Sequence, residues 1–252
     1  MRFLISIVVV TIYLSANFID SDFDGVEDSK DRCPNSDFFV IVDRYGCSVK
    51  KLTKPTKANY SLSLGYQYSK DDLIQNSYIV NFSFSYKNFS GYIESSRFNI
   101  DNESDFDDTT IALYYKIDRD NLEYVLGAGI YLPTGDESGN RSDYFASLKI
   151  NYFKGKFNSY ISYTHTFMRD SNSYDINSYS FGIGWQFSES LYSSISYSLG
   201  NSIYDSSTKT NYLNIFTNYY LTNNTYMTLS LTKGLNSSSV DKSLALFVGY
   251  DF

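Results

Sequence analysis

Several residue types that build metal, redox and nucleic-acid sites are scarce in this chain of 252 residues. One histidine and two cysteines are too few for a zinc cluster or an iron–sulfur centre. The 21 Lys and Arg residues are outnumbered by 28 Asp and Glu, and no long basic run occurs, which argues against nucleic acid as a partner. Because there is only one long apolar run, a protein with several membrane-spanning helices is also excluded.

Aromatic residues, by contrast, are abundant. Phe, Trp and Tyr make up 18% of the chain, with 26 Tyr and 19 Phe, which is more than an ordinary core requires. With 42% hydrophobic and only 19% charged residues, the chain is not of the disordered class. This composition favours an exported β protein rich in Tyr, Ser and Asn.

The N-terminus has the pattern of a secretory signal peptide over residues 1–16. Arg2 supplies the positive charge, the mostly apolar run Phe3–Leu14 is too short to span a bilayer, and Ala16 ends a small-residue cleavage pattern. A buried N-terminal helix or strand is the alternative.

The next segment has the ligand spacing of a calcium loop. Acids stand at loop positions 1, 3, 5, 9 and 12, with Gly25 at position 6 for the sharp turn and a backbone carbonyl at position 7. With Cys33-Pro34 and Cys47, residues 17–47 resemble a thrombospondin type 3 repeat, although family members usually carry several repeats in tandem. The resemblance implies a calcium ion held by Asp20, Asp22, Asp24, Val26 and Asp31, with Asp28 assisting through water. A solvated acidic linker is the alternative.

Cys33 and Cys47 are the two cysteines of the chain. After export we expect them to pair as a disulfide; a pair of free reactive thiols is the other interpretation. Residues 48–57 contain four lysines and no periodicity, which is typical of a linker.

From residue 58 to 252 apolar and small polar residues alternate with period two, which predicts twelve β-strands. The predicted links alternate in length: short ones lie near residues 87–88, 119–121, 154–156, 188–190 and 222–224, and long ones near 69–77, 99–108, 133–143, 169–178, 200–211 and 234–242. We therefore predict an all-β fold, a twelve-stranded antiparallel up-and-down transmembrane β-barrel of the bacterial outer membrane, with the small calcium-binding module and both termini in the periplasm. A secreted β-sandwich is the runner-up.

The chain ends on Phe252, in line with Leu244, Leu246, Val248 and Tyr250. This ending resembles the assembly signal of outer-membrane barrels, which implies outer-membrane lipid, lipopolysaccharide and the barrel-assembly machinery as partners. A periplasmic partner for the module is a further expectation.

The positions between the apolar ones are expected to face the lumen, and most are Ser, Asn, Thr, Gly or Gln. The predicted lumen charges are Lys116, Glu123 and Lys149, which either tune selectivity or pair with one another. Leu132-Pro133-Thr134-Gly135-Asp136 resembles a motif of putative outer-membrane transporters of the meta-pathway of aromatic degradation, which implies solute uptake. A strand end followed by a turn explains the same residues.

An enzyme is not expected. Twelve-stranded outer-membrane phospholipases carry a His-x-Ser pair, but here Phe167 follows His165 at that spacing, and a nucleophile needs an adjacent base. The sequence thus predicts a passive channel or transporter for small solutes. The alternative is a structural or surface-interaction protein without transport activity.

Overall fold

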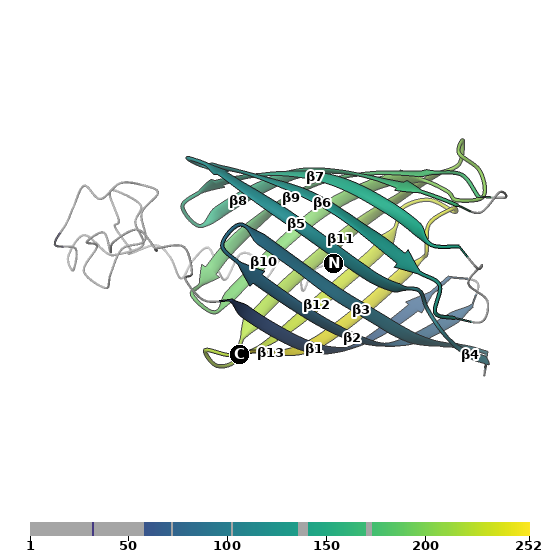
Figure 1. Ribbon diagram of the computed structural model, residues 1–252, viewed down its shortest axis with the longest axis horizontal. Helices are drawn as coiled ribbons and strands as arrows, with labels where there is room; N and C mark the ends of the chain where they lie inside the picture. Colours follow the sequence, from purple (N-terminus) through teal and green to yellow (C-terminus); the bar gives the residue numbers. More distant parts are fainter. Residues whose placement is uncertain (1–31, 33–57, 72, 102, 136–140, 170–172) are drawn as a thin grey trace, which may run out of the picture. The chain divides into compact units, whose positions relative to one another are not determined.

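The computed structural model describes residues 32, 58–71, 73–101, 103–135, 141–169 and 173–252, and this part of the chain contains thirteen strands. Twelve of them close into one antiparallel ring, because each pairs with the next along the chain and β1 pairs with β13 (Figure 1). The strands are β1 (Asn59–Lys70), β2 (Ile74–Tyr86), β3 (Phe89–Ile100), β4 (Glu103–Phe106), β5 (Thr109–Arg119), β6 (Leu122–Leu132), β7 (Asp143–Lys154), β8 (Phe157–Phe167), β9 (Ile176–Ser188), β10 (Leu191–Asn201), β11 (Lys209–Tyr220), β12 (Thr225–Gly234) and β13 (Lys242–Asp251). The predicted all-β class and twelve-stranded barrel are confirmed.

Among the described residues there is no helix of the length and apolarity that a membrane crossing requires.

Most apolar side chains of the barrel point outward. Leu62 lies opposite Phe82 and Leu64 opposite Val80, and the side chains of Leu62 and Leu64 are 43% and 61% exposed. Only four apolar residues of the described chain are buried: Ile79, Ala112, Phe145 and Ala245. A water-soluble protein hides its large apolar residues in a core, so this outer surface is suited to an apolar solvent.

Aromatic side chains form a belt near each end of the outer surface. At the end with the short turns, the Phe89 and Tyr115 rings lie 4.9 Å apart and Phe157 contacts Trp185. At the other end, Tyr163 and Tyr179 also lie 4.9 Å apart and Tyr66 contacts Tyr78. Aromatic belts of this kind are found where barrels meet the two membrane–water interfaces.

The short turns fall where the sequence predicted them. The links 87–88, 120–121 and 155–156 have two residues each, and their first residues, Lys87, Asp120 and Gly155, have φ angles of 54°, 50° and 57°. Tight hairpins need this left-handed conformation to match the twist of their strands.

Two of the predicted long links are wrong. The link predicted at 69–77 is shorter, because β1 runs to Lys70 and β2 begins at Ile74. In place of the loop predicted at 99–108, β3 runs to Ile100 and turns back into β4, which lies at one end of the barrel (Figure 1). Three of the four residues of β4 are exposed, so neither face selects apolar residues and the strand has no alternation for a sequence pattern to detect.

Glycines on the inner wall lie beneath aromatic rings of neighbouring strands. A Cβ atom at Gly65 would overlap the ring of Phe247, and one at Gly129 would overlap the ring of Phe145. Gly182 stands in the same relation to Tyr160, and Gly249 to Tyr226. Each ring therefore lies against the wall over a glycine.

This arrangement predicts that Gly129→Ala destabilises the barrel. Its Cβ would overlap the Phe145 ring and approach the Ile111 carbonyl oxygen, a backbone atom, to 2.6 Å. We expect the free energy of unfolding, measured by urea titration in detergent micelles, to fall by about 1–3 kcal/mol. Gly200→Ala is the matched control, since its nearest atom would be 3.2 Å away. Equal losses in both variants would contradict the role given to the ring.

Candidate functional site

The inner wall of the barrel is the candidate site, and small polar residues cover most of it. The side chains of Ser61, Ser83, Asn81 and Ser63 face one another across β1 and β2. The hydroxyl oxygens of Ser180 and Ser198 form a hydrogen bond of 2.9 Å across β9 and β10. The predicted inward positions are confirmed by the strand register, namely Asn81, Ser83, Ser85, Ser178, Ser180, Gly182, Gly184, Gln186, Ser194, Ser196 and Ser198.

Inward-facing aromatic residues were missed by the sequence analysis. Tyr92 and Tyr114 lie on adjacent strands, their rings 6.2 Å apart and nearly parallel. Others on the wall include Tyr131, Phe145, Tyr160, Tyr192, Phe216 and Phe247. Strict alternation already places Phe145, between Tyr144 and Ala146, on the inner face, but the lumen was expected to be lined mostly by small polar residues. A further signal was a glycine directly opposite an aromatic residue, as at Gly129 and Phe145.

Two of the three predicted lumen charges pair with each other. Lys116 Nζ lies 3.0 Å from Glu123 Oε2 and 3.5 Å from Asp118 Oδ1. The other oxygen of Glu123, Oε1, accepts a hydrogen bond of 2.8 Å from Asn151 Nδ2. This cluster lies toward the short-turn end of the wall, at adjacent positions of β5, β6 and β7.

Lys149, the third predicted charge, has a different environment. Its Nζ lies 4.3 Å from the centre of the Tyr160 ring, a cation–π contact, and it forms no ion pair with a described carboxylate. Glu94, which the sequence analysis did not select, accepts a hydrogen bond of 3.0 Å from Asn81. Both are inward-facing charges near mid-strand.

Acids outnumber bases on the inner wall. The register of the twelve barrel strands turns seven charged side chains inward. Five are carboxylates and two are lysines: Glu94, Asp118, Glu123, Asp143 and Asp251, against Lys116 and Lys149. The described wall therefore carries a formal charge of 2 − 5 = −3.

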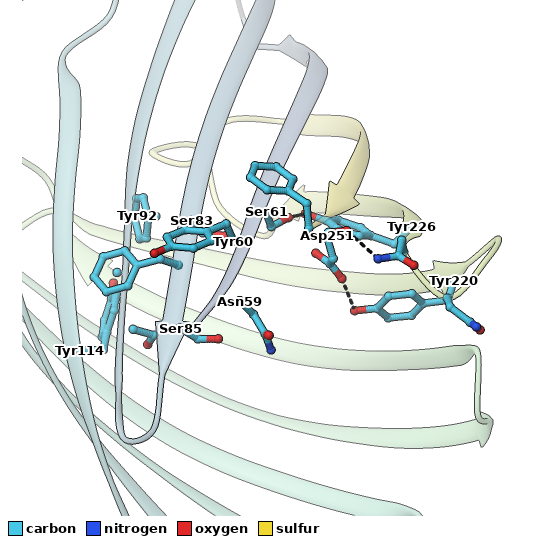
Figure 2. A pocket seen from close by; sticks show the side chains of 16 residues that line it. Asn59, Tyr60, Ser61, Ser83, Ser85, Tyr92, Tyr114, Tyr220, Tyr226 and Asp251 are labelled. Carbon is cyan, nitrogen blue, oxygen red and sulfur yellow. Dashed lines mark hydrogen bonds between the residues drawn. The ribbon is translucent and has the colours of Figure 1, made fainter. Parts of the chain in front are cut away.

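A cavity of about 730 Å³ opens at the short-turn end of the lumen. Tyr92, Tyr114, Tyr220 and Tyr226 line it together with serines of β1, β2 and β3 (Figure 2). Tyr226 Oη and Ser61 Oγ form a hydrogen bond of 2.8 Å, and the Tyr220 hydroxyl donates a hydrogen bond of 3.4 Å to the Asp251 carboxylate. The lining thus combines ring faces with hydroxyl groups, which suits a small hydroxylated solute.

The Leu-Pro-Thr-Gly segment packs against the end of β4. Thr134 Oγ1 donates a hydrogen bond of 2.6 Å to the carbonyl oxygen of Asp107 and lies 3.2 Å from Thr109 Oγ1. Gly135 lies so close to the Phe106 carbonyl that a Cβ atom would overlap it. The motif ends at Asp136, which lies outside the described residues.

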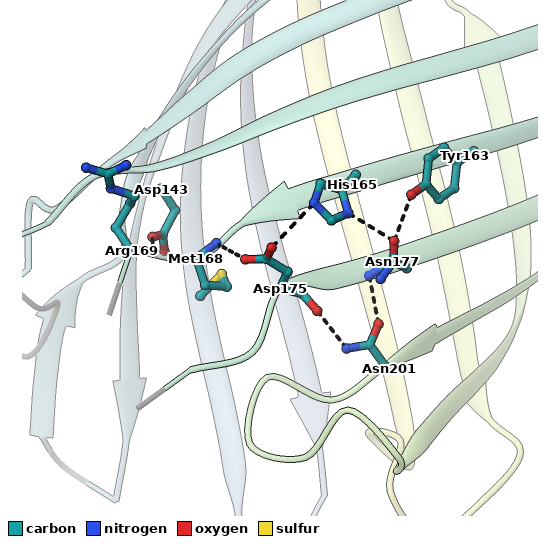
Figure 3. Close-up of polar contacts among 8 residues, drawn as sticks. All are labelled: Asp143, Tyr163, His165, Met168, Arg169, Asp175, Asn177 and Asn201. Carbon is teal, nitrogen blue, oxygen red and sulfur yellow. Dashed lines mark hydrogen bonds and ion pairs between the residues drawn. The ribbon is translucent and has the colours of Figure 1, made fainter. Parts of the chain in front are cut away.

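His165 lies on the outer face, opposite Ala146 and near the long-loop end. Its Nδ1 is 2.9 Å from Asn177 Oδ1, and its Nε2 is 3.5 Å from Asp175 Oδ2 (Figure 3). Tyr163 donates to the same Asn177 oxygen, and Met168 N donates to Asp175. The two ring nitrogens therefore connect β8 to the first residues of β9 and to the link that precedes it.

The predicted calcium and disulfide residues lie outside the described part of the chain: Asp20, Asp22, Asp24, Val26, Asp28, Asp31, Cys33 and Cys47. So do the predicted signal peptide, all of the module except Arg32, and the whole linker, residues 48–57. Within the described residues there is no cluster of three or more His, Cys, Asp or Glu side chains placed to hold a metal ion.

Solved structures share this architecture. An outer membrane channel from Pseudomonas putida F1 is similar over 81% of this chain and 100% of its own, with 12% identity and a TM-score of 0.64. The NanC porin matches over 77% and 98%, with 12% identity and a TM-score of 0.58. The KdgM porin matches over 75% and 99%, with 14% identity and a TM-score of 0.53. At these identities the likeness establishes the fold. No protein-family model and no curated protein matches the sequence.

The Gly135 contact predicts the behaviour of two loop variants. Gly135→Ala places a methyl group against the Phe106 carbonyl, so we expect the loop to detach and trypsin to cleave after Arg141 faster than in the unsubstituted protein. Thr134→Val removes only the hydrogen bond to Asp107, for which we expect a loss of about 1 kcal/mol in unfolding free energy. A Gly135→Ala protein cleaved at the unsubstituted rate would contradict this packing.

Proposed function

We propose that this chain is an outer-membrane channel through which small hydrophilic solutes diffuse, with a preference for cations and neutral hydroxylated molecules over anions. The observation that carries the proposal is the contrast between the two faces of one closed sheet. The outer face is apolar and belted by aromatics, while the inner face is polar and carries five carboxylates against two lysines.

Insertion in a membrane follows from the closed ring. A lipid bilayer has no groups that hydrogen-bond to backbone, so only strands that pair on both sides are stable there. Each barrel strand has two neighbours, and the exposed apolar residues have lipid as their natural solvent. The alternating apolar residues of β13 support recognition by the barrel-assembly machinery, and the apolar outer face supports contact with outer-membrane lipid.

The charge of the wall supports the cation preference. Acidic residues lining a pore raise the local concentration of cations and lower that of anions. The KdgM porin has been captured with an oligogalacturonate, which is a polyanion. The described wall has two lysines, one of them paired with Glu123, and no row of cations that would suit a polyanion, so we infer a different solute class here.

Conductance in a planar lipid bilayer tests the channel directly. We expect the refolded protein to give discrete conductance steps and, across a potassium chloride gradient, a reversal potential of the sign that cation preference produces. A folded, heat-modifiable barrel that never conducts would refute the open channel and favour a structural or surface-interaction role.

Two substitutions of single wall charges should shift selectivity in opposite directions. Glu94→Gln removes a negative charge and should lower the cation-to-anion permeability ratio, while Lys149→Gln should raise it. We expect changes of about twofold, because a unit charge about 10 Å from a passing ion in water contributes about 0.4 kcal/mol. Lys87→Gln is the control and should leave the reversal potential unchanged, because Lys87 lies in the turn after β2 with its Nζ over the ring of Tyr86, which faces outward. Shifts of one sign in all three variants would contradict the assignment.

We further propose that residues 17–47 bind calcium, which rests on the oxygen-ligand spacing from Asp20 to Asp31. Calorimetric titration of the folded full chain should show one site, and the paired substitutions Asp22→Asn and Asp24→Asn should abolish it. Glu103→Gln, in the barrel, should not. Binding that survives in the paired variant would place the calcium elsewhere.

A further inference from the structure

Three lysines stand side by side on the outer face of the barrel at its long-loop end. Lys70 of β1 lies directly opposite Lys242 of β13, and Lys242 lies directly opposite Lys233 of β12. All three side chains are exposed. Adjacent strands are about 4.8 Å apart, so the whole row spans about 10 Å. We call these three residues the lysine row.

The lysine row is unfavourable in the protein taken alone. Like charges directly opposite each other on neighbouring strands repel and destabilise the pair. No ion pair joins any of the three lysines to a described carboxylate, although Asp71 and Asp241 are their neighbours in sequence. An anion from outside the described chain would relieve this repulsion.

The position of the row indicates where that anion lies. A second row on the same face lies two residues nearer the barrel centre and is made by Tyr68, Leu244 and Leu231. Tyr68 is on the same face as Tyr66, two residues away, and Tyr66 belongs to the aromatic belt of the long-loop end. The lysine row thus begins where the apolar band ends, at the height of lipid headgroups, and long lysine side chains extend readily into that layer.

We propose that the lysine row binds the phosphate groups of an anionic lipid in the leaflet that surrounds the long-loop end. This proposal rests on membrane insertion as inferred above. A phosphate presents several oxygens, so ammonium groups about 5 Å apart can share one phosphate or hold two neighbouring ones. Among the other described outward or turn lysines, Lys87, Lys154 and Lys156 are at the short-turn end, and Lys209 of β11 is at the long-loop end but outside the row.

The experiment compares lipid retention by two triple variants with the unsubstituted protein. One replaces the row, as Lys70→Gln, Lys233→Gln and Lys242→Gln, and the control replaces Lys87, Lys154 and Lys156 by Gln, which removes the same charge from the opposite end. Each protein is offered a phosphorylated glycolipid and its dephosphorylated form, and bound lipid is counted by native mass spectrometry. Since each lysine near an anionic surface contributes on the order of a fivefold factor, we expect the row variant to retain at least about tenfold less phosphorylated lipid. The control should retain as much as the unsubstituted protein.

A second readout separates lipid binding from a folding defect. In uncharged detergent the row variant should unfold no earlier than the unsubstituted protein, because the repulsion has been removed. With phosphorylated lipid added, only the unsubstituted and control proteins should gain stability. Excess inorganic phosphate that gives the same gain would show that the row binds free phosphate and not a lipid headgroup.

Two further outcomes overturn the proposal. Equal retention of phosphorylated lipid by the row and control variants would show that total charge, and not the row, attracts the lipid. Equal retention of both lipid forms by the unsubstituted protein would show that phosphate is not recognised. Either result in a barrel that still inserts and conducts would leave the channel function standing, whereas a barrel that never inserts would refute that function itself.

Discussion

The backbone pairing between the first and last barrel strands is the interaction on which the rest of the structure depends. Ten residue pairs join β1 to β13, from Ser61 opposite Asp251 to Lys70 opposite Lys242. Beyond them, Tyr60 and Phe252 exchange backbone hydrogen bonds of 3.2 and 2.9 Å. Without this pairing two strands would expose unpaired amides, which lipid cannot satisfy. Closure also fixes which side of every strand faces the lumen.

Much of the fold could be predicted because lipid and water impose opposite demands on the two faces of one sheet. Alternation therefore located the strands and placed Lys116, Glu123 and Lys149 inside and His165 outside. It failed at Glu103–Phe106, where water reaches both faces of β4 and selects no alternation. The inward-facing aromatic residues Tyr92 and Phe145 were not expected, because the lumen was assigned mostly small polar side chains although an aromatic side chain is compatible with either face. Partner choice among charges, such as Lys116 with Glu123 but Lys149 with a ring, depends on register, which single-strand patterns do not contain.

Charges are sorted between the two surfaces. The inner wall collects carboxylates, whereas basic residues such as Arg97, Lys233 and Lys242 point outward. Arg97 lies over the Phe106 ring at 5.8 Å on the outer face of the β3–β4 hairpin. A net charge of −7 thus conceals a separation between an acidic lumen and basic outer positions. Such sorting matches a barrel with aqueous solutes inside and anionic headgroups around it.

The rings that lie over glycines tie together residues far apart in the sequence. Most of the barrel sequence lies between Gly65 and Phe247, yet the two residues are opposite each other, and the Phe247 ring fills the space that a side chain at Gly65 would need. The width of the lumen is consequently a property of such pairs. In relatives of this chain, a larger residue at the position of Gly65 should appear together with a smaller one at the position of Phe247. The width of the lumen would then stay the same although both residues change.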